Sequence, residues 1–363
     1  MFKTLMCRFF VVSLGVFLFG CGQKQAFETP LPIEVKVVVV NMFEIGEDEG
    51  DRPGEFQLWK AGQKLNKRFS FTHSHHDIYM NEDTGVMGIV TGMGTARAAA
   101  AIMALGLDDR FDFSKTYWLV AGIAGVDPAD ASIGSAIWAK WLVDGDLAHH
   151  IDAREMPTGW STGYFPLFTS EPLYSVKDGA YPVSQNGESY QLNANLADWA
   201  FSLTKNITLS DYPKMQELRE KYVNYPNAQK LPFVMIGDHL AASTFWHGSL
   251  MTDWANDWTK YWTQGEGNFV TSGMEDTGSF QSITYLDKVG KVDKNRFMVL
   301  RTASNYSMQP QGLTAAENLK LEMGADGFAG MQSALESAYT VGSKVVDTIV
   351  ADWDTYKATI PSA

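Results

Sequence analysis

Residues 88–107, GIVTGMGTARAAAAIMALGL, contain a short apolar segment, a glycine turn and a helix-forming segment in succession. The apolar residues 88–91 predict a buried strand that ends at Gly92 and Gly94. Residues 95–107 are rich in alanine, which has the highest intrinsic helix propensity. A strand that continues through a tight turn into a helix is typical of parallel sheets covered by helices.

Four further segments have the composition of buried strands. They are IEVKVVVV (33–40), YWLV (117–120), FVMI (233–236) and MVLR (298–301). Continuous apolar runs are typical of strands that are covered on both faces. We therefore predict an α/β fold with a mostly parallel, mixed central sheet flanked by helices.

The rest of the chain indicates one large domain over residues 33–363. Helices are predicted near 193–205 and over 329–352. Residues 153–232 have little sustained periodicity and are predicted to form an insertion made mainly of loops.

The composition excludes several classes of protein. The chain has 363 residues, of which 45% are hydrophobic and 20% charged, so it can bury a large core. It has 42 Asp and Glu against 29 Lys and Arg, a formal net charge of −13. Without a basic patch there are no cations to replace the counterions of a phosphate backbone, so we expect no nucleic-acid partner.

The N-terminus has the features of a bacterial secretion signal. Lys3 and Arg8 precede an apolar run from Phe9 to Gly20, which is shorter than the roughly 20 residues needed to span a bilayer. The sequence LFGC (18–21) resembles a lipobox, which predicts a signal peptide over 1–20, lipidation of Cys21 and a tether over 21–32. We expect an extracytoplasmic, lipid-anchored protein that faces the periplasm, or, alternatively, a plain signal peptide cut nearby.

No metal or cofactor is expected. Both cysteines, Cys7 and Cys21, lie at the N-terminus, so the domain has no thiol for a disulfide, a metal or a nucleophile. The histidines at 73–76 and 149–150 lack a specific zinc spacing. Structural or surface roles are the expected interpretation for them.

Six segments are expected to meet at one edge of the sheet, because ligands of open α/β sheets bind beyond the carboxyl ends of the strands. These segments are 41–56, 91–95, 121–126, 237–248, 271–280 and 302–309.

Two of these segments have alternative interpretations as anion or hydroxyl sites. Residues 91–95 could hold an anion on free N–H groups, or their glycines could serve only a tight turn. Glu275 and Asp276 are adjacent, so at most one of them is expected to face a ligand, and a carboxylate suits vicinal hydroxyls. A solvated turn is the alternative interpretation of 273–278.

Asn305 and a tryptophan-rich run offer groups for an aromatic ligand. Asn305 follows an apolar strand, and its amide can donate to and accept from the edge of a heterocyclic base, or it could simply cap the strand. The tryptophan-rich run 246–262 is typical of core packing, with a stacking surface as the alternative.

The order of these motifs resembles the purine nucleoside permease family, and it is similar to that of the nucleoside phosphorylase and nucleosidase superfamily. The matching motifs are NMFE (41–44), TGMG (91–94), AGIAG (121–125), Gly237-Asp238, Met274-Glu275 and Ser304-Asn305. The resemblance implies a nucleoside phosphorylase-like fold, a purine nucleoside as ligand and a homo-oligomer. It also implies glycine loops at Gly92, Gly94, Gly122 and Gly125.

The resemblance further assigns roles to individual residues. Glu275 would accept hydrogen bonds from the ribose hydroxyls, with Met274 against the sugar. Phe245 or Trp246 would stack on the base, and Asn305 would recognise the base and assist its departure. Glu44 is the candidate to orient or activate a water, and the alternatives to it are Glu47 and Glu55.

Three functions remain open. Cleavage of an N-glycosidic bond passes through a cationic sugar, which carboxylates stabilise. Phosphorolysis would need cations for the phosphate, yet the loop 41–56 has Arg52 among six carboxylates. We therefore favour a purine nucleoside hydrolase, followed by a non-catalytic nucleoside-binding lipoprotein that assists a separate transporter, and then a phosphorylase.

Overall fold

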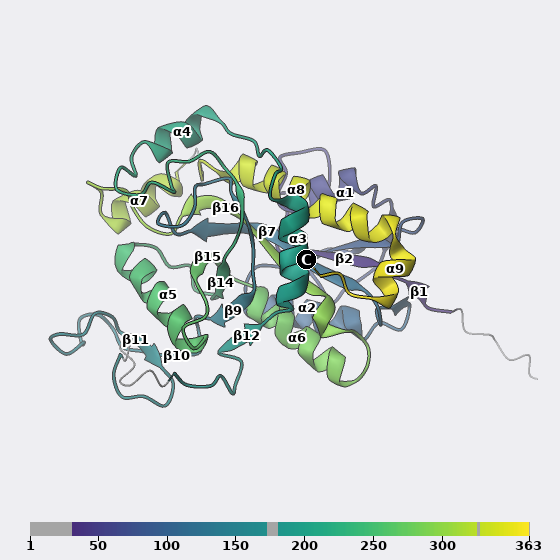
Figure 1. Ribbon diagram of the computed structural model, residues 1–363, viewed down its shortest axis with the longest axis horizontal. Coiled ribbons are helices and arrows are strands. Elements are labelled where there is room, and N and C mark those ends of the chain that lie inside the picture. The colour runs from purple at the N-terminus through teal and green to yellow at the C-terminus, as the bar shows by residue number, and fades with distance from the viewer. Residues whose placement is uncertain (1–30, 173–180, 325–326, 363) are drawn as a thin grey trace, which may run out of the picture. The chain divides into compact units, whose positions relative to one another are not determined.

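The computed structural model describes residues 31–172, 181–324 and 327–362. Residues from Pro32 onward form one compact unit, which is drawn as a ribbon in Figure 1. The predicted signal peptide, Cys21 and the tether up to residue 30 lie outside the described residues, so these assignments stay predictions. In the part of the chain that is described, no helix is both long and apolar enough to cross a membrane.

A mixed sheet of twelve strands, counted over the described residues, forms the centre of the unit. Its strands are β2 (Val37–Asn41), β3 (Lys67–Phe69), β4 (Ile78–Asn81), β5 (Val86–Val90), β7 (Tyr117–Val126), β8 (Ala136–Trp138), β9 (Trp141–Asp144), β12 (Ser189–Gln191), β13 (Val234–Ile236), β14 (Asp238–Ala241), β15 (Phe269–Gly273) and β16 (Phe297–Tyr306). Two small pairs lie outside it: β1 (Ile33–Glu34) with β6 (Phe111–Asp112), and β10 (Ala148–His150) with β11 (Tyr164–Pro166).

The main path of the sheet has the order β12-β9-β14-β15-β7-β2-β5-β4-β3. In the centre, β5, β2, β7 and β16 run parallel to one another. Antiparallel pairs occur at both edges and between β15 and β7. The sheet is therefore mixed with a parallel centre, as predicted.

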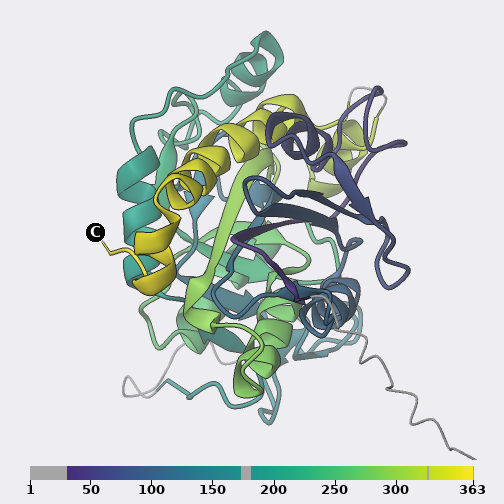
Figure 2. The ribbon, with the colours of Figure 1, turned by 90° about the vertical axis from the view of Figure 1, so that its right-hand side faces the viewer.

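The helices cover both faces of this sheet (Figure 2). They are α1 (Gln57–Gly62), α2 (Thr95–Gly106), α3 (Ala194–Thr204), α4 (Pro213–Arg219), α5 (Ser249–Trp262), α6 (Asp276–Lys288), α7 (Ala315–Glu322), α8 (Met331–Ala351) and α9 (Trp353–Ala358), with a 3₁₀ turn η2 (Lys294–Arg296). The predicted helices near 193–205 and 329–352 correspond to α3 and α8.

The valines of β2 explain why its sequence does not alternate in polarity. Val38 and Val40 pack in the core that includes residues of α2 and α6. Val37 and Val39 point to the opposite core, which includes residues of α1, α3 and α8. Because successive side chains of a strand face opposite sides, both faces need apolar residues.

The tryptophans of α5 belong to a third core. Trp254, Trp258 and Trp262 recur every four residues, so they share one face of the helix and pack over Leu240 and Phe269. Core packing is therefore the correct interpretation of this part of the tryptophan-rich run.

Two of the segments that were expected to follow strand ends are themselves largely strand. The stretch AGIAG (121–125) continues β7, and residues 302–306 continue β16. The two strands pair from Phe297 opposite Trp118 to Tyr306 opposite Val126, with one irregularity at Ser304; Arg301 lies opposite Gly122 and Asn305 opposite Gly125. Their mutual backbone hydrogen bonds and the close approach of neighbouring side chains keep the glycines extended, despite their low strand propensity.

Candidate ligand-binding site

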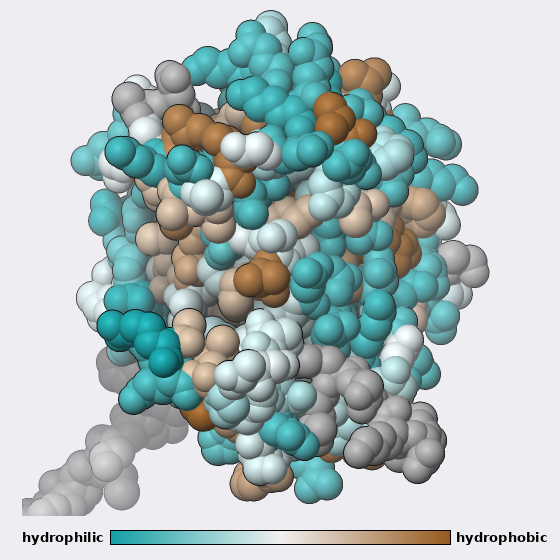
Figure 3. All heavy atoms as spheres, turned by 90° about the vertical axis from the view of Figure 1, so that its left-hand side faces the viewer, coloured by the Kyte–Doolittle hydropathy of each residue, from teal (hydrophilic) through white to brown (hydrophobic). Residues whose placement is uncertain are grey.

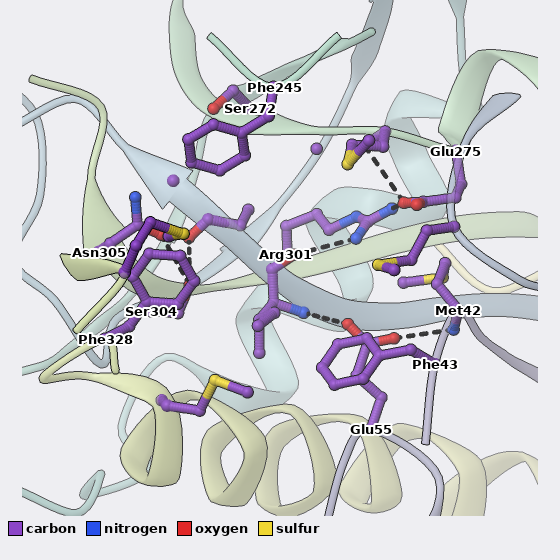
Figure 4. A pocket seen from close by; sticks show the side chains of 18 of the residues that line it. Met42, Phe43, Glu55, Phe245, Ser272, Glu275, Arg301, Ser304, Asn305 and Phe328 are labelled. Atoms are coloured by element: carbon purple, nitrogen blue, oxygen red, sulfur yellow. Dashed lines mark hydrogen bonds and ion pairs between the residues drawn. The ribbon is translucent and has the colours of Figure 1, made fainter. Parts of the chain in front are cut away.

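A cavity of about 460 Å³ lies beside β7, β15 and β16, and residues of all three strands line it (Figure 4). All six predicted segments contribute to its wall. Their lining residues are Met42, Phe43, Glu55, Met93, Ile123, Ala124, Gly125, Phe245, Ser272, Gly273, Met274, Glu275, Ser304 and Asn305. Five further residues complete the wall and were not predicted. They are Arg301 of β16, Leu319 of α7, Met323 and Phe328 between α7 and α8, and Met331 of α8.

Glu275 immediately precedes α6, and its side chain is 3% exposed. One oxygen, Oε1, accepts the N–H of Gly94 at 2.9 Å. The other, Oε2, accepts the N–H of Met274 at 3.2 Å and Nη2 of Arg301 at 2.9 Å. Of the two adjacent carboxylates, Glu275 alone is among the described residues that line the cavity, since Asp276 is turned into the protein.

The glycine turn before α2 binds a carboxylate of the protein itself. Gly92 and Gly94 have φ angles of 85° and 100°, a region that favours glycine. The N–H of Gly94 donates to Glu275, and that of Thr95 donates to Ser243 Oγ at 3.1 Å. These two groups are therefore occupied, which favours the tight-turn interpretation over a site for an external anion.

Glu44 is not one of the described residues that line the cavity, which corrects its predicted position. Its oxygens accept the backbone N–H groups of Ile45, Phe56 and Gln57 at 2.8, 2.9 and 2.7 Å, and also that of Gly54. Loops such as 41–56 carry backbone groups without sheet partners, and Glu44 satisfies four of these. It is thus the link that closes this loop.

Glu55, one of the two alternatives to Glu44, lies in the cavity wall and is 5% exposed. Its carboxylate accepts the N–H groups of Met42 and Ile123, each at 2.8 Å. Burial raises the pKa of Glu55 to about 8; nearby Arg301 opposes this shift and Glu275 adds to it. The other alternative, Glu47, is exposed.

Arg301 is the residue that the sequence did not bring out. It is 2% exposed, and its guanidinium donates to Glu275, to Asp276 and to the carbonyl of Ile123. Burial alone would raise the pKa of Asp276, but Arg301 and His239 beside it hold this pKa far below its usual value. The signal in the sequence was a single charge at the end of the apolar run MVLR (298–301).

An amide and two aromatic rings form another sector of the wall. The pairing of β16 with β7 skips Ser304, because Ala303 pairs with Ala124 and Asn305 with Gly125. This bulge lets two successive residues, Ser304 and Asn305, both line the cavity. Asn305 is 4% exposed, and its Oδ1 accepts from Ser304 Oγ at 2.9 Å.

The rings are those of Phe245 and Phe328, which are nearly parallel at 17° with centroids 6.5 Å apart. Trp246 is absent from the described part of the cavity wall, which corrects the alternative that it stacks on a base. Its ring packs on Trp254 and Phe269, at centroid distances of 5.9 and 5.8 Å. Burial against the core of α5 has turned this side chain away from the cavity.

Two glycines of β7 make room for these polar side chains. A Cβ at Gly122 would lie 2.0 Å from Met42 Cε and 2.5 Å from Glu55 Oε1. One at Gly125 would lie 2.9 Å from Ser272 Oγ. Glycine at both positions thus allows charged and polar groups to pack directly against the strand.

The Gly237-Asp238 motif has a structural role away from the cavity. Asp238 accepts the N–H groups of Trp141 and Asn268, at 2.8 and 2.7 Å, and so links neighbouring strands. Over the residues that the structure describes, no group of three or more His, Cys, Asp or Glu side chains could hold a metal ion.

The fold and the cavity define an α/β protein with a partly charged cavity beside its central strands. The chain belongs to the purine nucleoside permease family (NUP), whose family model matches residues 34–361. It is 30% identical over 328 residues to a probable purine nucleoside permease of Schizosaccharomyces pombe, which covers 88% of this chain and 90% of that relative. A purine nucleoside permease of Candida albicans is 31% identical over 282 residues, or 77% of this chain and 67% of its own.

Among solved structures, the chain is similar to a 5′-methylthioadenosine/S-adenosylhomocysteine nucleosidase of Neisseria meningitidis, with a TM-score of 0.47 and 15% identity. That match covers 86% of this chain and 99% of the nucleosidase. The futalosine hydrolase of Helicobacter pylori gives a TM-score of 0.49 at 12% identity and covers 86% and 98% of the two chains. The match to the family model and the two permease relatives confirm the family predicted from the sequence.

Proposed function

We propose that the cavity binds a purine nucleoside and that the protein hydrolyses its N-glycosidic bond. The observation that carries this proposal is the presence of two buried carboxyl groups, Glu55 and Glu275, in one cavity with an amide and two aromatic rings. A nucleoside has the complementary composition, a sugar rich in hydroxyls joined to a flat base. The volume of the cavity, about 460 Å³, is within the roughly 300–1,000 Å³ that is typical of small-molecule sites.

Glu275 would bind the ribose. Among the described residues, Gly94 is the donor to its Oε1, so a lone pair of this oxygen is left for a hydroxyl. A hydrogen bond to an ionised carboxylate is stronger than one between neutral groups. Met274, in the same wall, would lie against the apolar side of the sugar.

Phe245 and Phe328 would contact the faces of the base, and Asn305 its edge. An amide can donate and accept, so Asn305 could hydrogen-bond the departing base but could not give it a proton. The base would then take up its proton from solvent.

Glu55 would accept a proton from the attacking water. With a pKa of about 8 it is a stronger base, once ionised, than an ordinary glutamate, and it titrates near neutral pH, where general bases work best. The water oxygen bonds to the anomeric carbon while the N-glycosidic bond breaks. The electron pair of the broken bond leaves with the base. The negative charge of Glu275 would stabilise the cationic sugar.

Water is a better acceptor than phosphate in this cavity. Arg301 is the one cationic side chain among the described lining residues, and it is already paired with Glu275 and Asp276. A phosphate dianion would therefore meet more negative than positive charge.

The purified protein would be incubated with inosine and with adenosine, with and without phosphate. Free base released without phosphate is the expected result, and Glu55→Gln should lower the rate about 10²- to 10⁴-fold while binding persists. Ribose 1-phosphate as product would instead indicate a phosphorylase. No binding of either nucleoside would refute the proposal as a whole.

A second candidate is a non-catalytic nucleoside-binding lipoprotein that assists a separate transporter, and the names of the relatives favour it. Tight nucleoside binding without turnover would support it. The predicted lipid anchor and the periplasmic location would be tested by labelling cells with a radioactive fatty acid, with Cys21→Ala as the unlabelled control.

A further inference from the structure

Arg301 is held from several sides by buried partners. Its Nε donates to Asp276 Oδ1 at 3.2 Å, and its Nη2 donates to Glu275 Oε2 at 2.9 Å and also to Asp276 Oδ2. Its Nη1 donates to the carbonyl of Ile123 at 3.0 Å. Such a planar fork of donors has one orientation in which all these bonds form together.

Asp276 is fully buried and has a second buried partner, His239. Nε2 of His239 lies 3.0 Å from Asp276 Oδ2, and the other ring nitrogen of His239 lies 2.9 Å from Thr271 Oγ1. The series His239, Asp276, Arg301 and Glu275 therefore leads from the core to the cavity wall. Glu275 is the last of these groups and the one whose oxygen is open to a ligand.

The charges within this group depend on Arg301. Glu275 and Asp276 are adjacent, nearly without solvent, and would repel each other if both were ionised without a cation between them. The guanidinium bonds to both of them and so offsets this repulsion.

We propose that Arg301 is the positioning residue of the ribose site: it holds the Glu275 carboxylate in one orientation, and Asp276 fixes Arg301 in turn. This inference rests on the proposed binding of a nucleoside. It assigns Arg301 a role in recognising the sugar hydroxyls through Glu275, without contact between the guanidinium and the nucleoside.

Arg301→Lys is the principal variant, because an ammonium keeps the charge but cannot reproduce the fork. Arg296→Lys is its matched control: Arg296 is also 2% exposed and is paired with a carboxylate, Asp293, but it lies outside the described cavity wall and its other bonds go to the carbonyls of Tyr356 and Lys357. Affinities would be measured for inosine and for 2′,3′-dideoxyinosine, which lacks the ribose hydroxyls.

Arg301→Lys should weaken the binding of inosine about tenfold and leave that of dideoxyinosine within about twofold, because a charge-assisted hydrogen bond contributes about 1.5–3 kcal/mol. Arg296→Lys should leave the ratio of the two affinities unchanged. Equal losses for both ligands with Arg301→Lys, or no loss for either, would overturn the inference.

If Arg301→Lys does not fold, Asp276→Asn decides by the same comparison, with an expected loss of about threefold for inosine alone. A second readout does not depend on any nucleoside. In ¹H–¹⁵N NMR spectra, the amide of Gly94, which donates to Glu275 Oε1, should shift in Arg301→Lys and stay unchanged in Arg296→Lys.

Failure of the wild type to bind any nucleoside would refute the proposed function, while an unchanged Gly94 amide resonance in Arg301→Lys would refute the role of Arg301.

Discussion

Glu55 and Ile123 are 68 positions apart in the chain, yet the Glu55 carboxylate accepts the Ile123 N–H at 2.8 Å. The contact fastens the loop 41–56 to the middle of β7 and closes one side of the cavity (Figure 4). It also buries a carboxyl group, and burial raises the pKa of Glu55 to about 8. Burial thereby raises the pKa of the group proposed to activate water, and the hydrogen bond from Ile123 opposes part of this rise.

The first prediction concerns stability against pH. The pKa of Glu55 rises from 4.5 to about 8 on folding, so the folded state binds the proton more tightly than the unfolded state. The stabilisation from this proton is complete below about pH 4.5 and is lost as the pH rises through 8. Glu55→Gln has no such proton, so its melting temperature relative to that of the wild type should rise between pH 5 and 8.

The variant also loses a hydrogen bond at every pH, at a cost of about 1–3 kcal/mol, so the test is the slope and not the offset. Glu47→Gln, at an exposed position of the same loop, is the control and should follow the wild-type curve. Parallel curves for Glu55→Gln and wild type would show that Glu55 is ionised in the folded protein across this range.

The second prediction concerns the sugar. Glu275→Gln should weaken inosine binding about 10- to 100-fold, because a hydrogen bond to a charged group contributes about 1.5–3 kcal/mol. Titration calorimetry would measure this change, with Glu266→Gln, at an exposed position after α5, as the matched control. Unchanged affinity for Glu275→Gln would refute the ribose assignment.

The third prediction separates two neighbouring aromatic residues. Phe245 is 48% exposed and lines the cavity, so Phe245→Ala should weaken nucleoside binding by about 1–3 kcal/mol, the value of one base stacked on an aromatic ring. Its melting temperature should hardly change. Trp246 packs in the core of α5, so Trp246→Ala should destabilise the fold, by less than the roughly 3–5 kcal/mol of a fully buried Trp.

Calorimetric melting and nucleoside titration of both variants would check this contrast. The same pattern in the two variants, whether both lose affinity or both lose stability, would contradict it.

The fourth prediction uses two strand glycines. A Cβ at Gly122 would lie 2.5 Å from Glu55 Oε1, whereas one at Gly88 would lie 2.6 Å from the Phe56 ring, in a core away from the cavity wall. Both Gly122→Ala and Gly88→Ala should lower the melting temperature, since an overpacked core costs about 1–3 kcal/mol. Below both transitions, Gly122→Ala alone should bind nucleoside more weakly, and equal affinities in a binding assay would count against the packing described for Gly122.

Apolar side chains near the cavity are also exposed on the surface of the protein. Leu321 and Met323, at the end of α7, are 64% and 58% exposed. Figure 3 shows apolar side chains among polar ones on the face of the molecule that lies to the left in Figure 1, where α4, α5 and α7 are labelled. Leu319 of α7 and the following Met323 give the cavity wall an apolar part, while Glu55 and Glu275 give it carboxyl groups.

Much of the fold could be predicted from local sequence. The valines of β2, the alanines of α2 and the period of α8 each specify an element through side-chain periodicity and helix propensity, which do not depend on distant residues. The family was also accessible, because it rests on the order of short motifs. The segments that surround the cavity followed from one rule, that strand ends carry the site.

The choice between neighbouring side chains was not accessible in the same way. Glu44 and Glu55 belong to one loop, and Phe245 and Trp246 are adjacent, so composition and spacing cannot tell which of each pair faces the cavity. Glu55 is buried by its contacts with β7. Trp246 packs against the core that contains the tryptophans of α5 and does not line the cavity.

The sequence by itself therefore determined the α/β class, the succession of strands and helices, and the segments from which a site could be built, because these depend on interactions between near neighbours. Only the tertiary structure decided that Arg301 joins Glu275 and Asp276, that Glu55 is the buried carboxyl, and that Gly122 leaves it room. The reason is that burial and charge pairing depend on residues brought together from β7, β16 and the first loop, and these distances are not encoded in any single stretch of the chain.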